Sequence, residues 1–173
     1  NHKREDLNKY NQDLAVETKC TTLEDVMNDS DVFIGVSGAN LLSPNLISKM
    51  NQNPIIFALA NPNPEILPDE AHAVRDDIVM ATGRSDFPNQ VNNVLGFPFL
   101  FRGALDAKAS EISNDMLVAA ATALAALAKE DVPQSVLDAY DVGSMSFGKE
   151  YFIPKPFDPR LVDWVAKAVR DAA

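Results

Sequence analysis

Residues 31–37 carry the sequence Asp31-Val-Phe-Ile-Gly-Val-Ser37. The residues between the aspartate and the serine are apolar or glycine, several are β-branched, and polar residues do not alternate with them. A run of this kind predicts a strand that is buried on both faces, as strands in parallel sheets are. Ser37 and Gly38 then begin a loop at the carboxyl end of that strand.

Two later stretches have the same character and would supply two more strands. They are Pro54-Ile-Ile-Phe-Ala-Leu-Ala60 and Ile78-Val-Met-Ala81. The first of them stops at Asn61-Pro-Asn-Pro64, where two prolines prevent a regular continuation. Because parallel strands are normally connected by right-handed helical crossovers, the pattern predicts neighbouring parallel strands in an α/β sheet with flanking helices.

Helix signals stand before and between these strands. Two overlapping capping boxes, Thr21-x-x-Glu24 and Thr22-x-x-Asp25, predict a short first helix. Ser43 followed by Pro44 predicts a second helix start, and a third helix is expected around residues 68–74.

The strand and helix repeats are predicted to occupy about residues 1–95, and a mainly helical continuation about residues 96–173. Ser113 and Asp158 each precede a helix-start pattern in that second part. The expected apolar faces of these two helices are Leu117, Ala121, Leu124 and Ala128 for the first, and Leu161, Val162, Val165 and Val169 for the last. Asp163 and Lys167 are expected to pair on the outside of the last helix.

Composition excludes several classes of function. The 173 residues are enough for one domain, and 25 acidic against 15 basic residues give a net charge of −10. This charge argues against nucleic acid and anionic membranes as partners, because both require a basic surface. Cys20 is the single cysteine, so no intrachain disulfide can form, which fits a reducing compartment such as the cytoplasm. No apolar run is long enough to span a bilayer.

The candidate site lies at the carboxyl ends of the predicted strands, where open parallel sheets bind ligands. Loops leave these ends at Ser37-Gly38, at Ala60-Asn61 and at Thr82-Gly83, and the third soon reaches Asn92 and Asn93. The glycine of the first loop would allow backbone to approach a ligand. Asparagine amides donate and accept without carrying charge, which suits ribose hydroxyls, a nicotinamide carboxamide and substrate carboxylates.

Each asparagine also has a structural interpretation, because asparagine is common in turns. The turn is the favoured interpretation for Asn40, Asn63 and Asn89, and for Asn61 the two interpretations are equally supported. His2 and His72 have no partner at a metal-like or triad-like spacing, and no G-x-G-x-x-G occurs in the chain. From the residues alone, the chain is a partial α/β sheet with a ligand edge made of amides.

Several stretches together resemble the malic enzymes of the bacterial, shorter-subunit type. Besides residues 31–37 they are Ile56-Phe-Ala-Leu-Ala-Asn-Pro62, Ala81-Thr-Gly-Arg-Ser-Asp86, Pro88-Asn-Gln-Val-Asn-Asn93, Phe101-Arg-Gly-Ala-Leu-Asp106 and Ile153-Pro-Lys-Pro-Phe-Asp-Pro159. None is diagnostic alone, but their order and spacing are specific and cover nearly the whole chain. The resemblance implies the C-terminal part of an NAD(P)-binding domain, with a partial Rossmann-like parallel sheet and a helical C-terminal extension.

The resemblance also implies a reaction. L-Malate would be oxidised by NAD or NADP, and the resulting oxaloacetate, held on Mg²⁺ or Mn²⁺, would lose CO₂ to give pyruvate. By similarity, Ser37, Gly38, Asn61 and Asn92 are expected to bind the cofactor, and Asn93 to bind malate. A homodimer is expected for the full-length enzyme.

The family's tyrosine acid, lysine base, metal ligands and glycine-rich phosphate loop have no counterpart in this chain. The tyrosines at 10, 140 and 151 do not match the catalytic tyrosine, and Lys155 does not match the catalytic lysine. No catalytic residue and no metal ligand is therefore expected here, and the chain alone is predicted to be inactive. The acidic residue that would contact the adenine ribose is expected before Asn1, so the sequence does not specify NAD or NADP. The basic residues Lys3 and Arg4 are better interpreted as solvated side chains than as ligands of a 2′-phosphate.

Two alternatives remain open at this point. A malolactic-type enzyme would convert malate to lactate without net oxidation, and a non-catalytic cofactor-binding or assembly module would have no chemistry of its own. The context Gln90-Val-Asn-Asn93 fits the malic type better than the malolactic type. The chain begins with Asn1 rather than methionine, which is expected of a segment of a longer protein.

Overall fold

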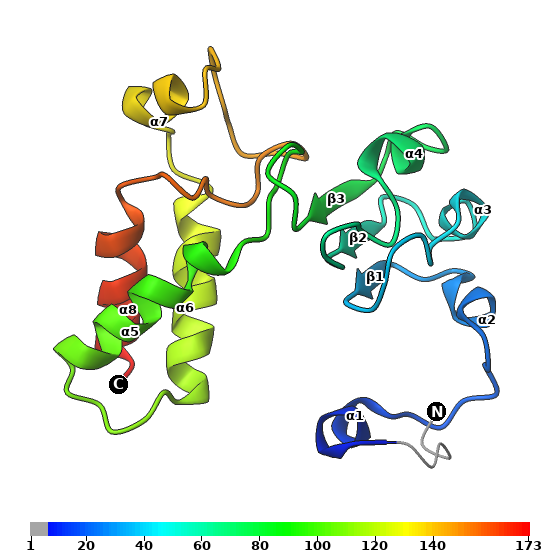
Figure 1. Cartoon of the computed structure of the whole chain (residues 1–173), viewed down its shortest axis with the longest axis horizontal. Coiled ribbons are helices and arrows are strands. Elements are labelled where there is room, and N and C mark those ends of the chain that lie inside the picture. The colour runs from blue at the N-terminus through cyan, green and yellow to red at the C-terminus, as the bar shows by residue number, and fades with distance from the viewer. Residues whose placement is uncertain (1–6) are drawn as a thin grey trace.

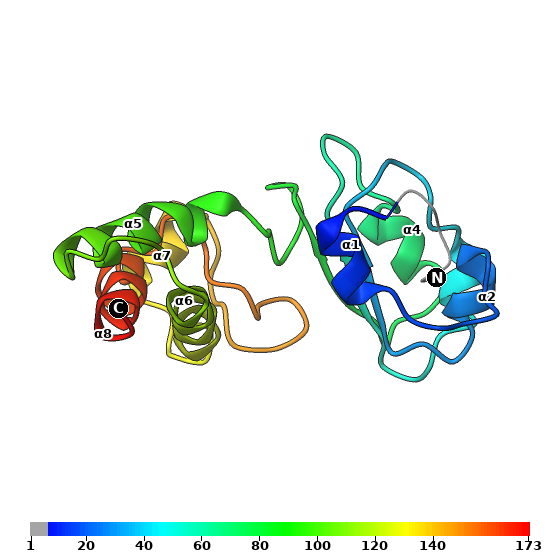
Figure 2. The same cartoon turned by 90° about the horizontal axis from the view of Figure 1, so that it is seen from below.

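The computed structural model describes residues 7–173, so His2, Lys3 and Arg4 lie outside the described residues. Figure 1 shows the elements in two groups, a small sheet with short helices and a set of longer helices. Figure 2 shows the same separation from a second direction, with α5, α6 and α8 together at one end. No helix in the described part of the chain is both long and apolar enough to cross a membrane.

The sheet consists of β1 (Val32–Gly35), β2 (Ile55–Ala58) and β3 (Val79–Thr82) in the order β1-β2-β3. Both pairs are parallel, and the register places Gly35 beside Ala58 and Ala58 beside Thr82. The predicted parallel arrangement of the three strands is confirmed. The third strand begins and ends one residue later than the sequence pattern indicated.

Four short helices belong to this group: α1 (Lys9–Leu14), α2 (Leu23–Met27), α3 (Pro44–Ile47) and α4 (Pro68–His72). The capping box of α2 is confirmed for Thr22, whose hydroxyl accepts the N–H of Asp25 at 3.2 Å while the Asp25 carboxylate accepts the N–H of Thr22 at 2.9 Å. Hydrogen bonds from the backbone of Thr21 and then of Thr22 lower the pKa of Asp25 to about 2. Ser43 precedes α3 as expected, but its side chain makes no capping hydrogen bond.

One face of the sheet carries the core of this group. Ile56, Ala58 and Met80 point into it and are buried with residues from the short helices and the loops between them, namely Met27, Leu42, Ile47, Met50, Ile66 and Ala71. On the other face, Ile34 is 63% exposed and Val36 is 77% exposed. The expectation that the first strand is buried on both faces is therefore wrong for this structure, because the helices α2, α3 and α4 supply core residues to one face only.

The second group contains η1 (Asn93–Leu95), α5 (Phe97–Asp106), α6 (Asn114–Leu127), α7 (Gln134–Ala139), η2 (Val162–Ala166) and α8 (Lys167–Asp171). Its core joins α5, α6 and the last helix around Leu100, Met116, Leu127, Val165 and Val169. Helix α5 lies close to both η2 and α8 at Gly103, where a Cβ would be 2.5 Å from the backbone oxygen of Ala166 in η2 and 2.6 Å from Val169 Cβ in α8.

The buried face of α6 agrees only in part with the expected one, because Ala128 is buried and Leu124 packs against the core, whereas Ala121 is exposed. Ser113 caps the helix as predicted, accepting the N–H of Met116 at 3.3 Å. The buried positions within the helix, however, are Met116, Ala120, Ala123 and Leu127, and Leu117 is 47% exposed. Alanine occurs on every side of this helix, so the apolar pattern did not determine which side packs inward.

The last helix is partly confirmed. Leu161, Val165 and Val169 are fully buried as expected, but Val162 is exposed. A wider turn over Val162–Ala166 precedes α8 and shifts the side chains relative to a regular helix. Lys167 accordingly pairs with Asp171 at 2.8 Å rather than with Asp163.

The chain between α7 and the last helix returns to the sheet, as Figure 1 shows for the orange segment beside β3. Phe152 in this segment stacks on Phe57 of β2, with ring centroids 5.9 Å apart and an interplanar angle of 14°. The two groups of elements are thus joined both by the segment after β3 and by this returning segment.

Candidate functional site

The carboxyl ends of the three strands lie level with one another. Because Gly35, Ala58 and Thr82 are register neighbours, the loops that follow them leave the same edge of the sheet. This edge holds the predicted positions Ser37, Gly38 and Asn61. The geometry therefore brings the first two predicted loops together where parallel sheets bind ligands.

The first loop exposes Ser37, whose backbone N–H donates to Glu65 Oε1 at 3.0 Å. A Cβ at Gly38 would meet only Leu41 Cδ1, at an ordinary distance of 3.7 Å. The protein's own packing does not require a glycine there. The open side of Gly38 is free for the backbone to approach another molecule.

The second loop begins with Asn61, an exposed residue joined to Pro62 by a cis peptide bond. Its side chain lies against Gly83 at the end of β3, where a Cβ would be 3.1 Å from Asn61 Oδ1 and 3.2 Å from Nδ2. The absence of a side chain at 83 thus lets the amide cross from one strand end to the next. The sequence placed Gly83 only at the start of the third loop, and no local signal indicated its contact with the Asn61 side chain.

The third loop returns to the sheet edge before it reaches the last two predicted positions. The N–H of Val91 donates to the Thr82 carbonyl at 2.7 Å, which brings the following residues back beside β3. Asn92 then caps η1, its Oδ1 accepting the N–H of Val94 at 3.0 Å. Its acceptor is therefore engaged, and the amide N–H groups remain for other partners. Asn93 follows and is exposed.

Asn92 and Asn93 line a cleft of about 590 Å³ that is otherwise mainly apolar. Phe57, Leu100 and Phe152 contribute to its walls from the sheet, from α5 and from the returning segment. Ser37, Gly38 and Asn61 are not among the lining residues. The structure therefore places the five predicted residues in two neighbouring places, the edge of the strands and this cleft.

Charges in the third loop are paired within it. Arg84 donates to both oxygens of Asp86, at 2.9 and 2.6 Å, and its guanidinium lies 5.3 Å from the ring centre of Phe87. The hydrogen bonds to Asp86 raise the pKa of Arg84 and lower that of Asp86. The loop therefore presents little net charge beside the amides of the edge.

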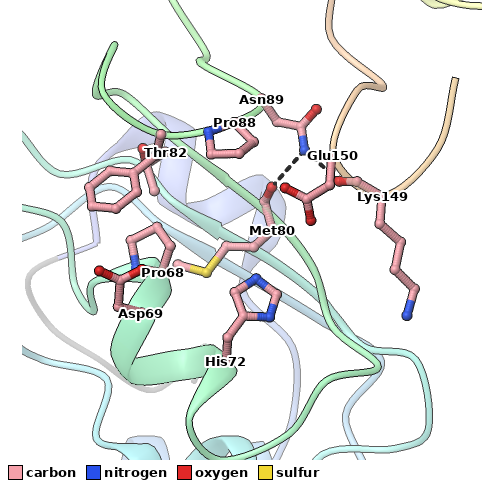
Figure 3. Close-up of a pocket in the computed structure, with 10 residues that line it drawn as sticks. Pro68, Asp69, His72, Met80, Thr82, Pro88, Asn89, Lys149 and Glu150 are labelled. Carbon is pink, nitrogen blue, oxygen red and sulfur yellow. Dashed lines mark hydrogen bonds between the residues drawn. The ribbon is translucent and has the colours of Figure 1, made fainter. Parts of the chain in front are cut away.

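Asn89 has the left-handed backbone expected of a turn, with φ of 54°, but it does more than form the turn. Figure 3 shows its buried amide beside Met80, Lys149 and Glu150. The Nδ2 group donates to the carbonyls of Met80 at 3.1 Å and Lys149 at 2.6 Å, and Oδ1 accepts the N–H of Phe152 at 2.9 Å. The interpretation as a turn residue alone is incomplete, because this side chain ties the returning segment to β3.

A second hollow lies between α4 and the residues after β3 (Figure 3), and its volume is about 250 Å³. Asp69, His72 and Glu150 line it, while the Lys149 amine turns away and donates to the Asp76 carbonyl at 3.3 Å. No cluster of three or more His, Cys, Asp or Glu in residues 7–173 is placed to hold a metal ion. The described side chains therefore do not by themselves form a site for Mg²⁺ or Mn²⁺, and a location of the metal ligands outside this chain stays a prediction.

Tyr140 and Lys155, which the family pattern does not match to an acid or a base, lie near each other. Lys155 Nζ is 5.1 Å from the ring centre of Tyr140, and the Tyr140 hydroxyl accepts the N–H of Phe157 at 3.3 Å. Burial lowers the pKa of Lys155 and raises that of Tyr140. Neither residue borders the cleft that contains Asn93.

Similarity to known proteins identifies the family to which this sheet edge belongs. Residues 1–139 match the family model described as "Malic enzyme, NAD binding domain". The chain belongs to the malic enzyme family. The matched range contains the three strands and the three loops that leave their carboxyl ends.

Within the malic enzyme family, the chain is 56% identical over 170 residues to the NADP-dependent malic enzyme of Halomonas elongata, covering 98% of the chain and 40% of that protein. It is 49% identical over 159 residues to the NAD-dependent malic enzyme of Rhizobium meliloti, covering 92% of the chain and 21% of that protein. The crystal structure of the NAD-dependent malic enzyme of Thermotoga maritima superposes with a TM-score of 0.74 at 39% identity, over 88% of this chain and 36% of that one. The chain thus corresponds to less than half the length of these malic enzymes.

Proposed function

We propose that the chain forms the C-terminal part of the NAD(P)-binding domain of an enzyme that oxidatively decarboxylates L-malate. In this proposal residues 1–95 supply the strand and helix repeats, and residues 96–173 supply their helical continuation. The main structural observation is the exposed amide of Asn61, which lies over Gly83 where the three parallel strands end side by side. Membership of the malic enzyme family supports the assignment of the reaction.

The cofactor is proposed to be NAD or NADP, since relatives named for each are similar to this chain. Ser37, Gly38, Asn61 and Asn92 would hold it. The Ser37 side chain and the Asn61 amide are exposed and uncharged, so they can orient hydroxyl and carboxamide groups without an ionic contact. Asn92 would act through its N–H donors, because its oxygen caps η1. When bound, the cofactor supplies the acceptor for the malate hydride.

Malate is proposed to contact Asn93. Its exposed amide can donate a hydrogen bond to a substrate carboxylate at the mouth of the apolar cleft. A donor bordered by apolar walls interacts more strongly with a carboxylate than the same donor in bulk water, because the local dielectric constant is lower. Asn93 would therefore orient the substrate, while proton transfer and metal binding would fall to residues outside this chain.

The remaining partners are proposed from composition and family. A net charge of −10 disfavours nucleic acid and anionic membranes as partners, and a single cysteine is compatible with the cytoplasm. The full-length enzyme is proposed to be a homodimer.

The reaction can be tested by product balance. Full-length enzyme supplied with L-malate, Mn²⁺ and either NAD or NADP should form pyruvate, CO₂ and reduced cofactor in equal amounts, since the hydride lost by malate appears in the cofactor. Lactate formed without net reduced cofactor would instead indicate the malolactic reaction. Cofactor binding without any turnover of malate would indicate a non-catalytic module.

A further inference from the structure

Glu65 is a fully buried carboxylate that the proposed function does not yet use. It lies in the segment after Asn61, and none of the ion pairs among the described residues includes it. A buried carboxylate without a cationic partner requires other compensation, because its desolvation is costly. The partners it has instead are backbone N–H groups.

The two oxygens of Glu65 each accept one of these N–H groups. Oε1 accepts from Ser37 at 3.0 Å, and Oε2 accepts from Ala60 at 3.1 Å. Ser37 lies two residues beyond the end of β1, and Ala60 lies two residues beyond the end of β2. One side chain therefore fixes the backbone at equivalent points of two loops at the sheet edge.

The backbone of the same segment holds the first loop as well. The carbonyl of Glu65 accepts the N–H of Leu42 at 3.0 Å, and the carbonyl of Pro64 accepts the N–H of Asn40 at 3.1 Å. The first loop is thus fastened at both of its ends to the segment that follows Asn61. Any shift of that segment would move both loops together.

Gly35 makes room for this arrangement. A Cβ at this position would lie 2.5 Å from Glu65 Oε1, in a core position of β1 where other residues would pack a side chain. The carboxylate occupies the space that a side chain at 35 would fill. The Glu65 side chain, 30 residues later in the chain, therefore packs directly against Gly35. The glycine is required by this contact and not by the conformation of β1.

We propose that Glu65 is a positioning residue for the cofactor, which it serves by holding the Ser37–Gly38 loop and Asn61 in one fixed relation. This inference rests on the proposed function, because those loops are the ones assigned to NAD or NADP. A carboxylate suits the role because both of its oxygens accept hydrogen bonds. A glutamine of the same shape has one accepting and one donating end, so it would leave one of the two N–H groups facing another donor.

The first test compares Glu65→Gln with Glu70→Gln in the full-length enzyme. Glu70 is an exposed glutamate on α4, which makes it a matched control. Titration with NADH and NADPH should show at least about a tenfold weaker binding for Glu65→Gln, the factor expected for one lost hydrogen bond to a charged group. The KM for malate should change less than the KM for the cofactor, and Glu70→Gln should resemble the wild type in both.

A second test separates positioning from folding. Gly35→Ala should lower the melting temperature strongly in the wild type, and much less in a Glu65→Ala background, where the space is free. In the double variant the added methyl group at residue 35 no longer clashes with the side chain at residue 65, so its melting temperature should recover. It should still bind NADH and NADPH weakly, because the N–H groups of Ser37 and Ala60 lack their acceptor.

The inference is overturned if Glu65→Gln binds both reduced cofactors within twofold of the wild type. It is also overturned if cofactor and malate constants rise equally, or if the penalty of Gly35→Ala is the same in both backgrounds. A wild-type enzyme that binds the cofactor but does not oxidise malate would refute the proposed reaction. The NADH and NADPH binding measurements on Glu65→Gln would then still test whether Glu65 positions the cofactor. A wild-type enzyme that binds neither cofactor would refute both.

Discussion

Asn93 and Asn61 are exposed amides with different neighbours, so their replacement should affect different kinetic constants. Asn93 borders the apolar cleft, whereas Asn61 lies against Gly83 at the strand ends. In the full-length enzyme, Asn93→Asp should lower kcat/KM for malate at least about tenfold, because a lost hydrogen bond to a charged group costs about 1.5–3 kcal/mol and the new carboxylate adds repulsion. Asn61→Ala should change mainly the cofactor constants. Steady-state kinetics with each substrate varied in turn measure both effects, and unchanged malate kinetics in Asn93→Asp would place the substrate elsewhere.

Asn89 gives a prediction about stability. Its buried amide makes three hydrogen bonds, two of them to a segment about 60 residues later in the chain. Asn89→Ala removes these bonds and places alanine at a positive φ, so the free energy of unfolding should fall by about 2–4 kcal/mol. Asn63→Ala, at an exposed position of negative φ, is the control and should change it by less than about 0.5 kcal/mol. Equal urea midpoints for the two variants would contradict the role assigned to Asn89.

The roles of single residues could be predicted where they depend on neighbours in the sequence, but not where they depend on contacts between distant segments. The position of Asn61 at a strand end and the turn at Asn89 follow from neighbouring residues. The contacts of Asn89 with Lys149 and Phe152, and the fit of Glu65 against Gly35, depend on how segments far apart in the chain meet. No periodicity or capping rule contains that information.

Arg75 joins the end of α3 to the segment before β3. Its guanidinium donates to the carbonyls of Ile47, Met50 and Asn51, and it is held by the carboxylate of Asp77. Asp77 also accepts the N–H of Asn53 at 2.7 Å. These hydrogen bonds, chiefly those from Arg75, lower the pKa of Asp77 well below its usual range.

This pairing predicts how stability depends on pH. Because the folded-state pKa of Asp77 is lowered, its stabilising contribution is fully present above the unfolded-state pKa of about 3.9 and is lost as the pH falls through the folded-state value. The difference in unfolding free energy between the wild type and Asp77→Asn should therefore be constant from pH 7 to about pH 5 and shrink below about pH 4. Urea unfolding of both proteins across this range measures the difference, and a difference that persists unchanged at about pH 2 would contradict the assignment.

The crossing of α5 and α8 depends on Gly103. A Cβ there would lie 2.5 Å from the Ala166 carbonyl oxygen and 2.6 Å from Val169 Cβ, so the two helices would have to separate. Gly103→Ala should destabilise the chain by about 1–3 kcal/mol, as overpacking does. Gly143→Ala meets nothing within 4 Å and should cause no loss. Thermal unfolding of the two variants is the comparison, and similar melting temperatures would show that the helices adjust without cost.

The elements differ in how well they could be predicted. The three strands were found because short apolar runs without alternation, bounded by turn residues, are typical of strands in parallel sheets. The caps at Thr22 and Ser113 were found because capping is a local hydrogen bond. The inward face of α6 was only partly predicted because its alanines make all sides similar. In the last helix only Val162 and the outer ion pair were misplaced, because of the wider turn before α8.

The chain as a whole presents the proposed cofactor edge of a malic enzyme without a metal site among its described residues. Ile34 and Val36 leave an apolar face of the sheet exposed, and residues 7–173 hold no cluster suited to a metal ion. A polypeptide of these 173 residues alone, given malate, Mn²⁺ and either cofactor, should therefore form no reduced cofactor above the buffer rate.

The same polypeptide should also bind NAD weakly, since it has no glycine-rich loop for the pyrophosphate. Turnover by the purified 173-residue chain would overturn the assignment of roles.

The returning segment also sets an order of events during synthesis. The hydrogen bonds of Asn89 with Lys149 and Phe152 cannot form until those residues are made, and they lie 60 and 63 residues later in the chain. At about 5–20 residues per second, the ribosome delivers these partners roughly 3–12 s after Asn89 itself. For that interval the Asn89 amide lacks two of its three hydrogen-bond partners, and the ring of Phe57 lacks the Phe152 ring that stacks on it in the finished structure. A nascent chain therefore exposes an unstacked aromatic ring and an incompletely paired amide for several seconds. Binding by a ribosome-associated chaperone during that time would protect this region from association with neighbouring chains.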